Sequence, residues 1–179
     1  MKPIVAALLA GWLLIPLAEA GPMSCALGRG GRDAVVTITR SHPIGNTAIY
    51  SLQQGQAPRR PFFEGEPDDS RGSDLRTQCA NGRAMRVWGD FFSAGYPRGF
   101  VIVREPRTGG FVRLDFAERN APGWLYLGKE DRLLVFPPGG RMETRGRYLV
   151  YRFGAGSPDE KIVDTLPNTR DYEVIRFKR

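Results

Sequence analysis

The chain has 179 residues, of which 26 are Lys or Arg and 19 are Asp or Glu, so its formal net charge is +7. The length suits one domain with a core of its own. Two cysteines and one histidine are too few ligands for a closed zinc site, so we expect neither a metal nor a cofactor. The basic residues are nearly all arginine, which suits carboxylate and phosphate contacts, although a GC-rich genome would produce the same bias.

The first twenty residues have the pattern of a cleavable secretion signal. A positively charged start precedes an apolar run from Ile4 to Leu17, and the run ends in the small-x-small sequence Ala18-Glu19-Ala20. A run of about 14 residues is short for a membrane span, and an uncleaved anchor is the alternative. The compact signal looks bacterial, so we expect residues 21–179 to form a single domain in the periplasm.

Cys25 and Cys79 are expected to form a disulfide, because an oxidising compartment pairs two cysteines by default. The bond would tie the start of the mature chain to its middle. Closing a loop of that length would stabilise the fold by about 4 kcal/mol on the chain-entropy model. Two free thiols are the alternative.

Short apolar or alternating runs separated by Gly- and Pro-rich turns predict an all-β, mainly antiparallel fold, a sandwich or a barrel. The expected strands, about nine in number, are 34–39, 47–52, 84–88, 99–104, 110–116, 124–127, 132–136, 147–153 and 172–177. The connections 105–109 and 128–131 are typical of hairpins. At most a helical turn is expected at 90–94 or 159–164. Residues 53–78, rich in Pro, Gly and charge, predict a long loop excursion of the kind that is often functional.

The predicted strands place apolar residues on one face and arginines and tyrosines on the other. Most antiparallel sheets have a core face and a solvated face, which is the ordinary interpretation. The sharper hypothesis is an aromatic-lined basic binding face formed by Arg86, Arg113, Arg152 and Arg176.

A second candidate for partner binding is the proline-framed segment 58–63, which contains Arg59, Arg60, Phe62 and Phe63. Exposed arginine with aromatic residues is the composition of interface hot spots. The alternative is that the two phenylalanines pack into the core beneath the long excursion.

Catalytic patterns are weak in this sequence. His42 is the only histidine and precedes a proline in a turn-like setting, without a Gly-x-Ser-x-Gly elbow to serve. The acidic residues of 64–69 lack the order of a calcium loop and are expected to form a solvated loop, with Arg71 and Arg76 as internal partners. Residues 28–32 lack the Lys-Ser/Thr of a phosphate-binding loop and are expected to be a flexible lead-in. We therefore expect a protein that is not an enzyme.

In overall plan the chain resembles the small periplasmic immunity proteins of Gram-negative bacteria that neutralise type VI secretion effectors, including phospholipase effectors. The residues that prompt the comparison are Gly123-Trp124-Leu125-Tyr126-Leu127-Gly128 and Leu133-Leu134-Val135-Phe136-Pro137-Pro138-Gly139-Gly140. The resemblance implies a stoichiometric inhibitor that blocks a toxin, and it assigns no functional residue.

Three hypotheses follow from the sequence. The first is a binding protein that inhibits an acidic toxin, with no nucleic-acid partner, because nucleic acid is scarce in the periplasm. The second is a lipocalin-like barrel or sandwich that binds a lipid, an anionic ligand or an envelope glycan in a cavity lined by Tyr126, Tyr148, Tyr151 and arginines. The third is an envelope enzyme of unrecognised type, which would depend on His42.

Overall fold

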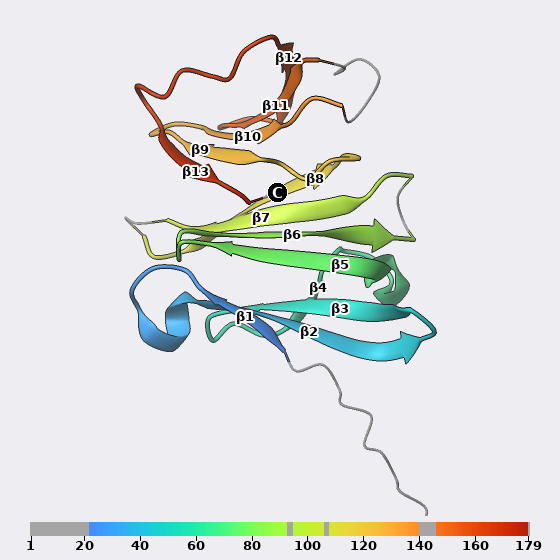
Figure 1. Cartoon of the computed structure of the whole chain (residues 1–179). Helices are drawn as coiled ribbons and strands as arrows, with labels where there is room; N and C mark the ends of the chain where they lie inside the picture. The colour runs from blue at the N-terminus through green and yellow to red at the C-terminus, as the bar shows by residue number, and fades with distance from the viewer. Residues whose placement is uncertain (1–21, 93–94, 106–107, 140–145, 179) are drawn as a thin grey trace, which may run out of the picture.

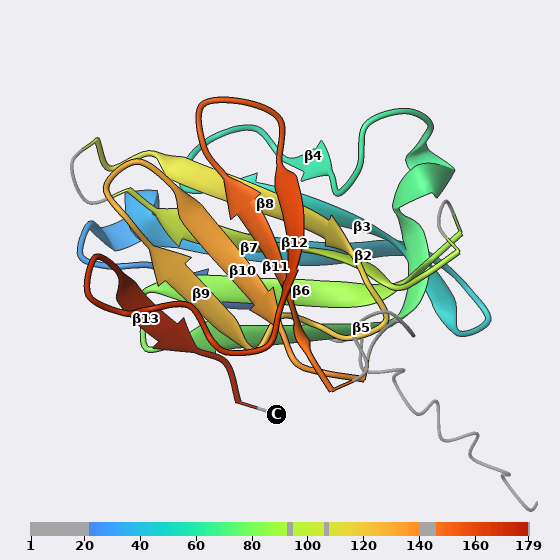
Figure 2. The ribbon, with the colours of Figure 1, turned by 90° about the horizontal axis from the view of Figure 1, so that it is seen from above.

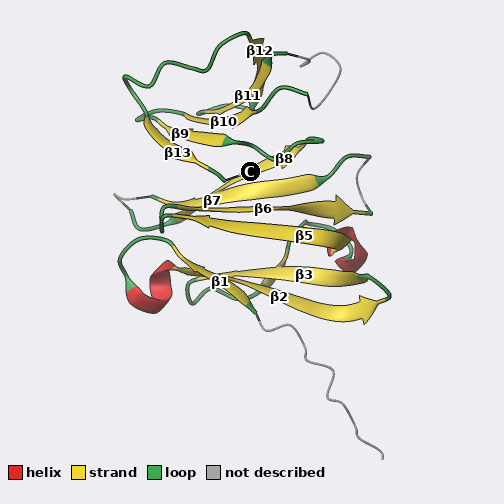
Figure 3. Cartoon of the chain, viewed as in Figure 1, coloured by secondary structure: helices red, strands yellow, loops and turns green. Residues whose placement is uncertain are grey.

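The described part of the chain folds into two antiparallel β-sheets. The structure, a computed structural model, describes residues 22–92, 95–105, 108–139 and 146–178 (Figure 1). The predicted signal peptide lies outside these residues. Within them, no helix is both long enough and apolar enough to cross a membrane. The secondary structure is almost entirely strand, with two short 3-10 turns (Figure 3).

The first sheet comprises β1 (Met23–Ala26), β2 (Val35–Ile44), β3 (Thr47–Gln54), β4 (Arg60–Pro61), β5 (Arg71–Ala80), β6 (Ala84–Phe91), β7 (Arg98–Arg104) and β8 (Phe111–Ala117). Its order is β1-β2-β3-β5-β6-β7-β8, and β4 pairs with β3. The pairing of β3 with β5 covers only Ala48–Ile49 and Arg71–Gly72. The sheet turns back at this short junction, so β1–β3 form a tier beneath β5–β8 (Figure 1).

The second sheet comprises β9 (Trp124–Leu127), β10 (Arg132–Phe136), β11 (Tyr148–Phe153), β12 (Asp159–Val163) and β13 (Glu173–Arg176). Its strand order is β12-β11-β10-β9-β13. Seen from above, it crosses over the upper tier of the first sheet, with β13 and the end of the chain on the side of β5 (Figure 2). Neither strand order closes on itself, so the expected sandwich is confirmed and the barrel alternative is not.

Two hydrophobic cores lie on opposite faces of β7. Phe100 and Ile102 belong to the lower core, which lies between β7 and strands β1–β3. Val101 and Val103 belong to the upper core, which lies between β7 and the second sheet. Side chains alternate along a strand, so a strand buried on both faces has an uninterrupted apolar sequence. This explains the run from Phe100 to Val103. The outer face of the second sheet holds a third, smaller cluster around Tyr126.

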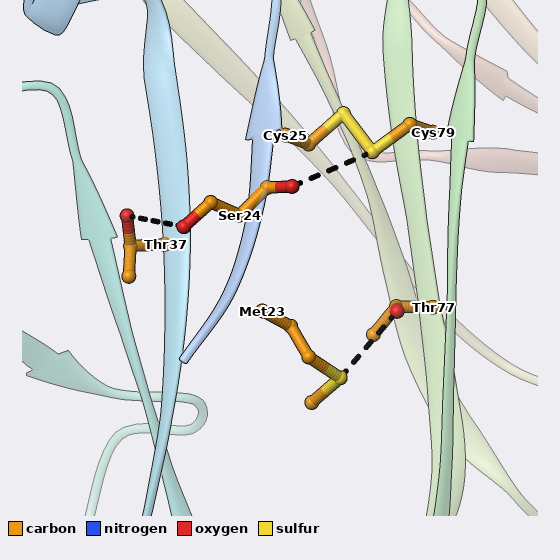
Figure 4. The surroundings of a disulfide bond; sticks show 6 residues. All are labelled: Met23, Ser24, Cys25, Thr37, Thr77 and Cys79. Carbon is orange, nitrogen blue, oxygen red and sulfur yellow. Dashed lines mark hydrogen bonds between the residues drawn. A yellow bond between two sulfur atoms is a disulfide. The ribbon is translucent and has the colours of Figure 1, made fainter. Parts of the chain in front are cut away.

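The expected disulfide is confirmed and joins β1 to β5 (Figure 4). The Cα atoms of Cys25 and Cys79 are 5.9 Å apart. Beside the bond, the Thr77 hydroxyl donates to the Sδ atom of Met23 at 3.6 Å. β5 therefore pairs with β3 at its start and contacts β1 at its end. At that end the disulfide joins β5 to β1, and among the described residues no backbone hydrogen-bond ladder joins these two strands.

The predicted strands are all present, and so are the hairpins that join β7 to β8 and β9 to β10. Strands β1, β4, β5 and β12 were not expected. Of the two segments that could hold at most a helical turn, 159–164 contains β12 and no helical turn, and residues 93–94 of the other lie outside the described residues. The loop excursion is shorter than predicted, because β5 begins at Arg71. The excursion contains β4 and the 3-10 turn η2 (Pro67–Ser70). In the segment 28–32, which was expected to be a flexible lead-in, residues 28–30 form a bend, and the 3-10 turn η1 (Gly31–Ala34) follows.

Candidate functional site

A groove with a volume of about 840 Å³ opens beside β5 and β6, where β9 begins and β13 ends. Five cationic side chains line it: Arg76, Arg86, Arg119, Arg176 and Lys178. Two tryptophans, Trp88 and Trp124, line it as well, and no Asp or Glu of the part of the chain that the structure describes is among the lining residues. The groove is therefore basic and aromatic, a combination that suits an anionic ligand or an acidic protein surface.

Arg86 forms the floor of the groove and connects the two sheets. One terminal nitrogen donates to the Pro122 carbonyl at 2.6 Å. The other donates to Gln78 Oε1 at 2.7 Å and to the Lys178 carbonyl at 3.0 Å. The guanidinium also lies 4.2 Å from the centroid of the Trp88 ring and 4.9 Å from that of Phe177. The side chain thus links β5 to the segment before β9 and to the C-terminal segment.

Burial of Arg86 has an electrostatic cost. The residue is only 5% exposed, and desolvation lowers its pKa to about 10. The side chain remains protonated at neutral pH, since this pKa is still well above 7. Its Nε atom is buried and has no hydrogen-bond partner within the described residues. The floor of the groove consequently holds a cation that is fixed by hydrogen bonds but keeps one N–H group without a partner among the described residues.

Strand alternation accounts for the composition of the floor. On β5 and β6, Gln78 lies opposite Arg86 and Arg76 opposite Trp88, and these side chains point to the same face as Ala80 and Ala84 of the upper core. Gly99 of β7 stands opposite Trp88, and a Cβ atom there would come within 2.7 Å of both Trp88 and Phe116. The glycine leaves room for the Phe116 ring and for the Cβ atom of Trp88.

Among the described residues, the more exposed cations of the groove have no salt-bridge partner. Within the described ranges, no salt bridge is recorded for Arg76, Arg119, Arg176 or Lys178. The guanidinium carbon of Arg119 lies 5.6 Å from the centroid of the Tyr96 ring. Some arginines elsewhere on the surface do pair with a carboxylate, as Arg83 does with Glu173 and Arg147 with Asp164. The groove cations are therefore available to an external anion.

The structure divides the four arginines that the sequence suggested as one binding face. Arg86 and Arg176 come from different sheets, and both are among the residues that line the groove. Arg113 lies on the lower face of β8, 4.0 Å from the centroid of Phe100, and pairs with Asp115. Arg152 lies at the far end of the second sheet, where its Nε donates to Asp131 at 2.5 Å, and this hydrogen bond raises the pKa of Arg152. The four side chains do not form a common face.

The segment with Arg59 and Arg60 is also divided. Both arginines are exposed, whereas Phe62 and Phe63 are 1% and 6% exposed and pack in the lower core. The ring centroid of Phe62 lies 5.0 Å from that of Phe100 in an edge-to-face contact. For these two phenylalanines the core alternative is therefore the observed arrangement, and their rings are not presented to a partner.

The remaining sequence candidates lie away from the groove. His42 is exposed near the β2–β3 hairpin, and its carbonyl accepts a hydrogen bond from Arg71. In the acidic segment, Asp68 pairs with Arg71, and a side-chain oxygen of Asp69 accepts the Glu66 N–H. Arg76, expected to partner this segment, lines the groove instead.

The three tyrosines of the suggested ligand cavity are not on one surface. Tyr126 and Tyr148 lie in the outer cluster of the second sheet, whereas Tyr151 lies on the inner face and donates to Glu118 at 2.6 Å. A cavity lined by all three is therefore not formed.

Sequence reasoning missed Arg76, Trp88, Arg119, Trp124 and Lys178 as groove residues. One signal for Trp88 was present, since it follows Arg86 by two residues on a predicted strand and must share its face. The others come from the unpredicted β5, from a connection and from strand ends, so only tertiary packing brings them together.

Comparison with known proteins adds no relative: no protein-family model, curated protein or solved structure matches this chain.

Proposed function

We propose that this protein is a non-enzymatic binding protein of the bacterial periplasm that inhibits a secreted toxin by covering an acidic surface of it. The basic groove would be the contact site. This function agrees with the overall plan shared with periplasmic immunity proteins. It is carried by one observation, the convergence of five cations and two tryptophans on a groove to which the described residues contribute no carboxylate.

The chemistry of the groove supports a protein partner. Arginine and tryptophan dominate interface hot spots, because each buries a large area and retains a directional polar group. Unpaired surface cations accelerate the encounter with an acidic partner, and desolvated contacts slow its release. The Trp88 side chain is half-buried beside the Arg86 guanidinium, so the floor is already ordered before a partner arrives.

The predicted secretion signal and the disulfide support the proposed compartment. The disulfide is compatible with an oxidising location outside the cytoplasm. In such a location an inhibitor would meet a toxin that acts on the cell envelope.

The test is protection of cells from a toxin encoded beside this gene. The toxin is exported to the periplasm of a sensitive host, with and without this protein, and survival is scored together with the dissociation constant of the purified pair. We expect protection and a one-to-one complex. Absence of both contradicts the proposal.

Charge reversal assigns the protection to the groove. The double variant Arg119→Glu/Arg176→Glu should weaken binding by about 100-fold or more and abolish protection. The matched control is Arg32→Glu/Arg40→Glu, which changes the net charge equally at exposed positions outside the groove. Equal loss in both variants would show that net charge matters and the groove does not.

A second candidate is a small anionic ligand such as a lipid headgroup. The groove volume of about 840 Å³ falls within the range of small-molecule sites and favours this reading. Titration with inorganic phosphate and with anionic and zwitterionic vesicles, followed by tryptophan fluorescence, separates the two candidates. A change with anionic vesicles alone favours the lipid headgroup, and no change with any of them favours the protein partner.

A further inference from the structure

We infer that β8 is a self-association edge, through which two copies of this chain join their first sheets into one continuous antiparallel sheet. This inference is independent of the groove and of the proposed inhibitor function. It rests on the free hydrogen-bonding groups of β8 and on a pair of opposite charges placed two residues apart.

The hydrogen-bond pattern shows which backbone groups of β8 are free. At the hairpin, Glu105 N–H donates to the Gly110 carbonyl, and at the other end Glu118 N–H donates to the Pro97 carbonyl. Hydrogen-bonded and non-hydrogen-bonded pairs alternate along an antiparallel ladder, so the backbone groups of alternate residues point away from β7. The outward residues are Phe111, Arg113, Asp115 and Ala117. In the part of the chain that the structure describes, β8 has no neighbouring strand on this side.

This edge has less protection against pairing than the other end strands, since its two charges, Arg113 and Asp115, are opposite in sign and pair with each other. β8 has seven residues, contains neither Lys nor Pro, and pairs with β7 in an unbroken register without a bulge. The end strands of the second sheet differ, because β13 has only four residues and β12 begins Asp159-Glu160-Lys161. β1, at the other end of the first sheet, has four residues and is bonded to β5 through the disulfide. β8 is thus the longest end strand among those described.

Space is available beside the edge. A hollow of about 680 Å³ separates the excursion from Phe111 and Arg113. The excursion therefore does not seal the lower side of β8, and a second strand can approach Arg113 from the open side.

The charges of β8 select one register for a two-fold pair. With the axis at Leu114, Arg113 of each copy lies opposite Asp115 of the other, and Phe111 lies opposite Ala117. Opposite charges in directly facing positions stabilise a strand pair. A shift that moves the axis to position 113 or 115 places two arginines or two aspartates face to face, which is destabilising. Within one copy, Arg113 and Asp115 already lie on the same face, with the nearest nitrogen and oxygen 2.5 Å apart.

The test is the mass of the full secreted protein in solution, measured by sedimentation and by light scattering between about 1 and about 500 µM. We expect a concentration-dependent dimer of the wild type. Asp115→Arg and Arg113→Asp should each weaken the dimer by about tenfold or more, since both facing pairs become like charges. A wild type that stays monomeric at every concentration overturns the inference.

An equimolar mixture of Asp115→Arg and Arg113→Asp tests the register. In a mixed pair, two arginines of one copy face two aspartates of the other, so the dimer should return and be heterodimeric. The control Asp164→Arg removes a surface ion pair outside β8 and should leave the dimer unchanged. Unweakened single variants, a mixture without heterodimer or a control that loses the dimer each overturn the proposed edge. Circular dichroism verifies that every variant is folded.

Discussion

The guanidinium carbon of Arg86 lies 4.2 Å from the centroid of the Trp88 ring, and both side chains project from the same face of β6. Phe177, at the end of the chain, approaches the same guanidinium from the second sheet at 4.9 Å. One buried cation therefore packs against aromatic rings from both sheets. Because the same side chain forms the floor of the groove, the stability of the domain and the shape of its candidate site depend on one residue.

Replacing Arg86 should destabilise the fold. Arg86→Met removes three hydrogen bonds and leaves the Pro122 and Lys178 carbonyls without this donor, so we expect a loss of about 2–4 kcal/mol in the free energy of unfolding. Urea unfolding followed by tryptophan fluorescence measures it. The comparison variant Arg176→Met, at an exposed groove position, should change stability by no more than about 0.5 kcal/mol. Equal stability of the two variants would contradict the structural role of Arg86.

Removing the disulfide should lower stability by about 4 kcal/mol, because a sequence separation of 54 residues is no longer closed in the unfolded chain. The variant is Cys25→Ala/Cys79→Ala, and urea unfolding with and without a reductant is the measurement. The reductant should destabilise the wild type to the same degree and leave the variant unaffected. A wild type insensitive to the reductant under unfolding conditions would contradict this expectation.

The excursion should be anchored by its phenylalanines and not by its arginines. Phe62→Ala should cost about 3–5 kcal/mol of stability, because the ring is 1% exposed and contacts Tyr50, Phe63, Phe91 and Phe100. Arg59→Ala, at an exposed position nearby, should stay within about 0.5 kcal/mol of the wild type. Thermal unfolding of the two variants is the measurement. A large loss of stability in Arg59→Ala with none in Phe62→Ala would show that the arginine, and not the phenylalanine, anchors the excursion.

Alkaline pH should reduce stability through Tyr126. Burial raises the pKa of its phenol above the ordinary value of 10.0, so the folded protein keeps a proton that the unfolded chain releases. The stabilisation is complete below about pH 10 and is lost as the pH rises through the folded pKa. Urea unfolding between about pH 8 and about pH 11 should show a shallower decline for Tyr126→Phe than for the wild type. Identical slopes in the wild type and in Tyr126→Phe would contradict the prediction.

Strand alternation made much of the fold readable from the sequence. Val36 and Ile38 are fully buried on the side that their spacing predicted. Leu149 and Tyr151 point to the inner face of β11, and Val150 to the outer cluster, also as expected. β5 was missed because it begins within a segment rich in charge and glycine, where its pairing with β6 outweighs a weak local preference.

The sequence by itself determined the all-β class, the cysteine pair, the hairpins and the alternation of most strands, because these depend on local spacing and on the redox setting of the chain. Only the tertiary structure decided which charges meet. Arg86 and Arg176 are ninety residues apart and belong to different sheets, whereas Arg113 and Arg152, on strands of similar pattern, lie elsewhere. The physical reason is that alternation tells which face of a strand a side chain occupies, but the crossing of the second sheet over β5–β8 determines which faces lie together.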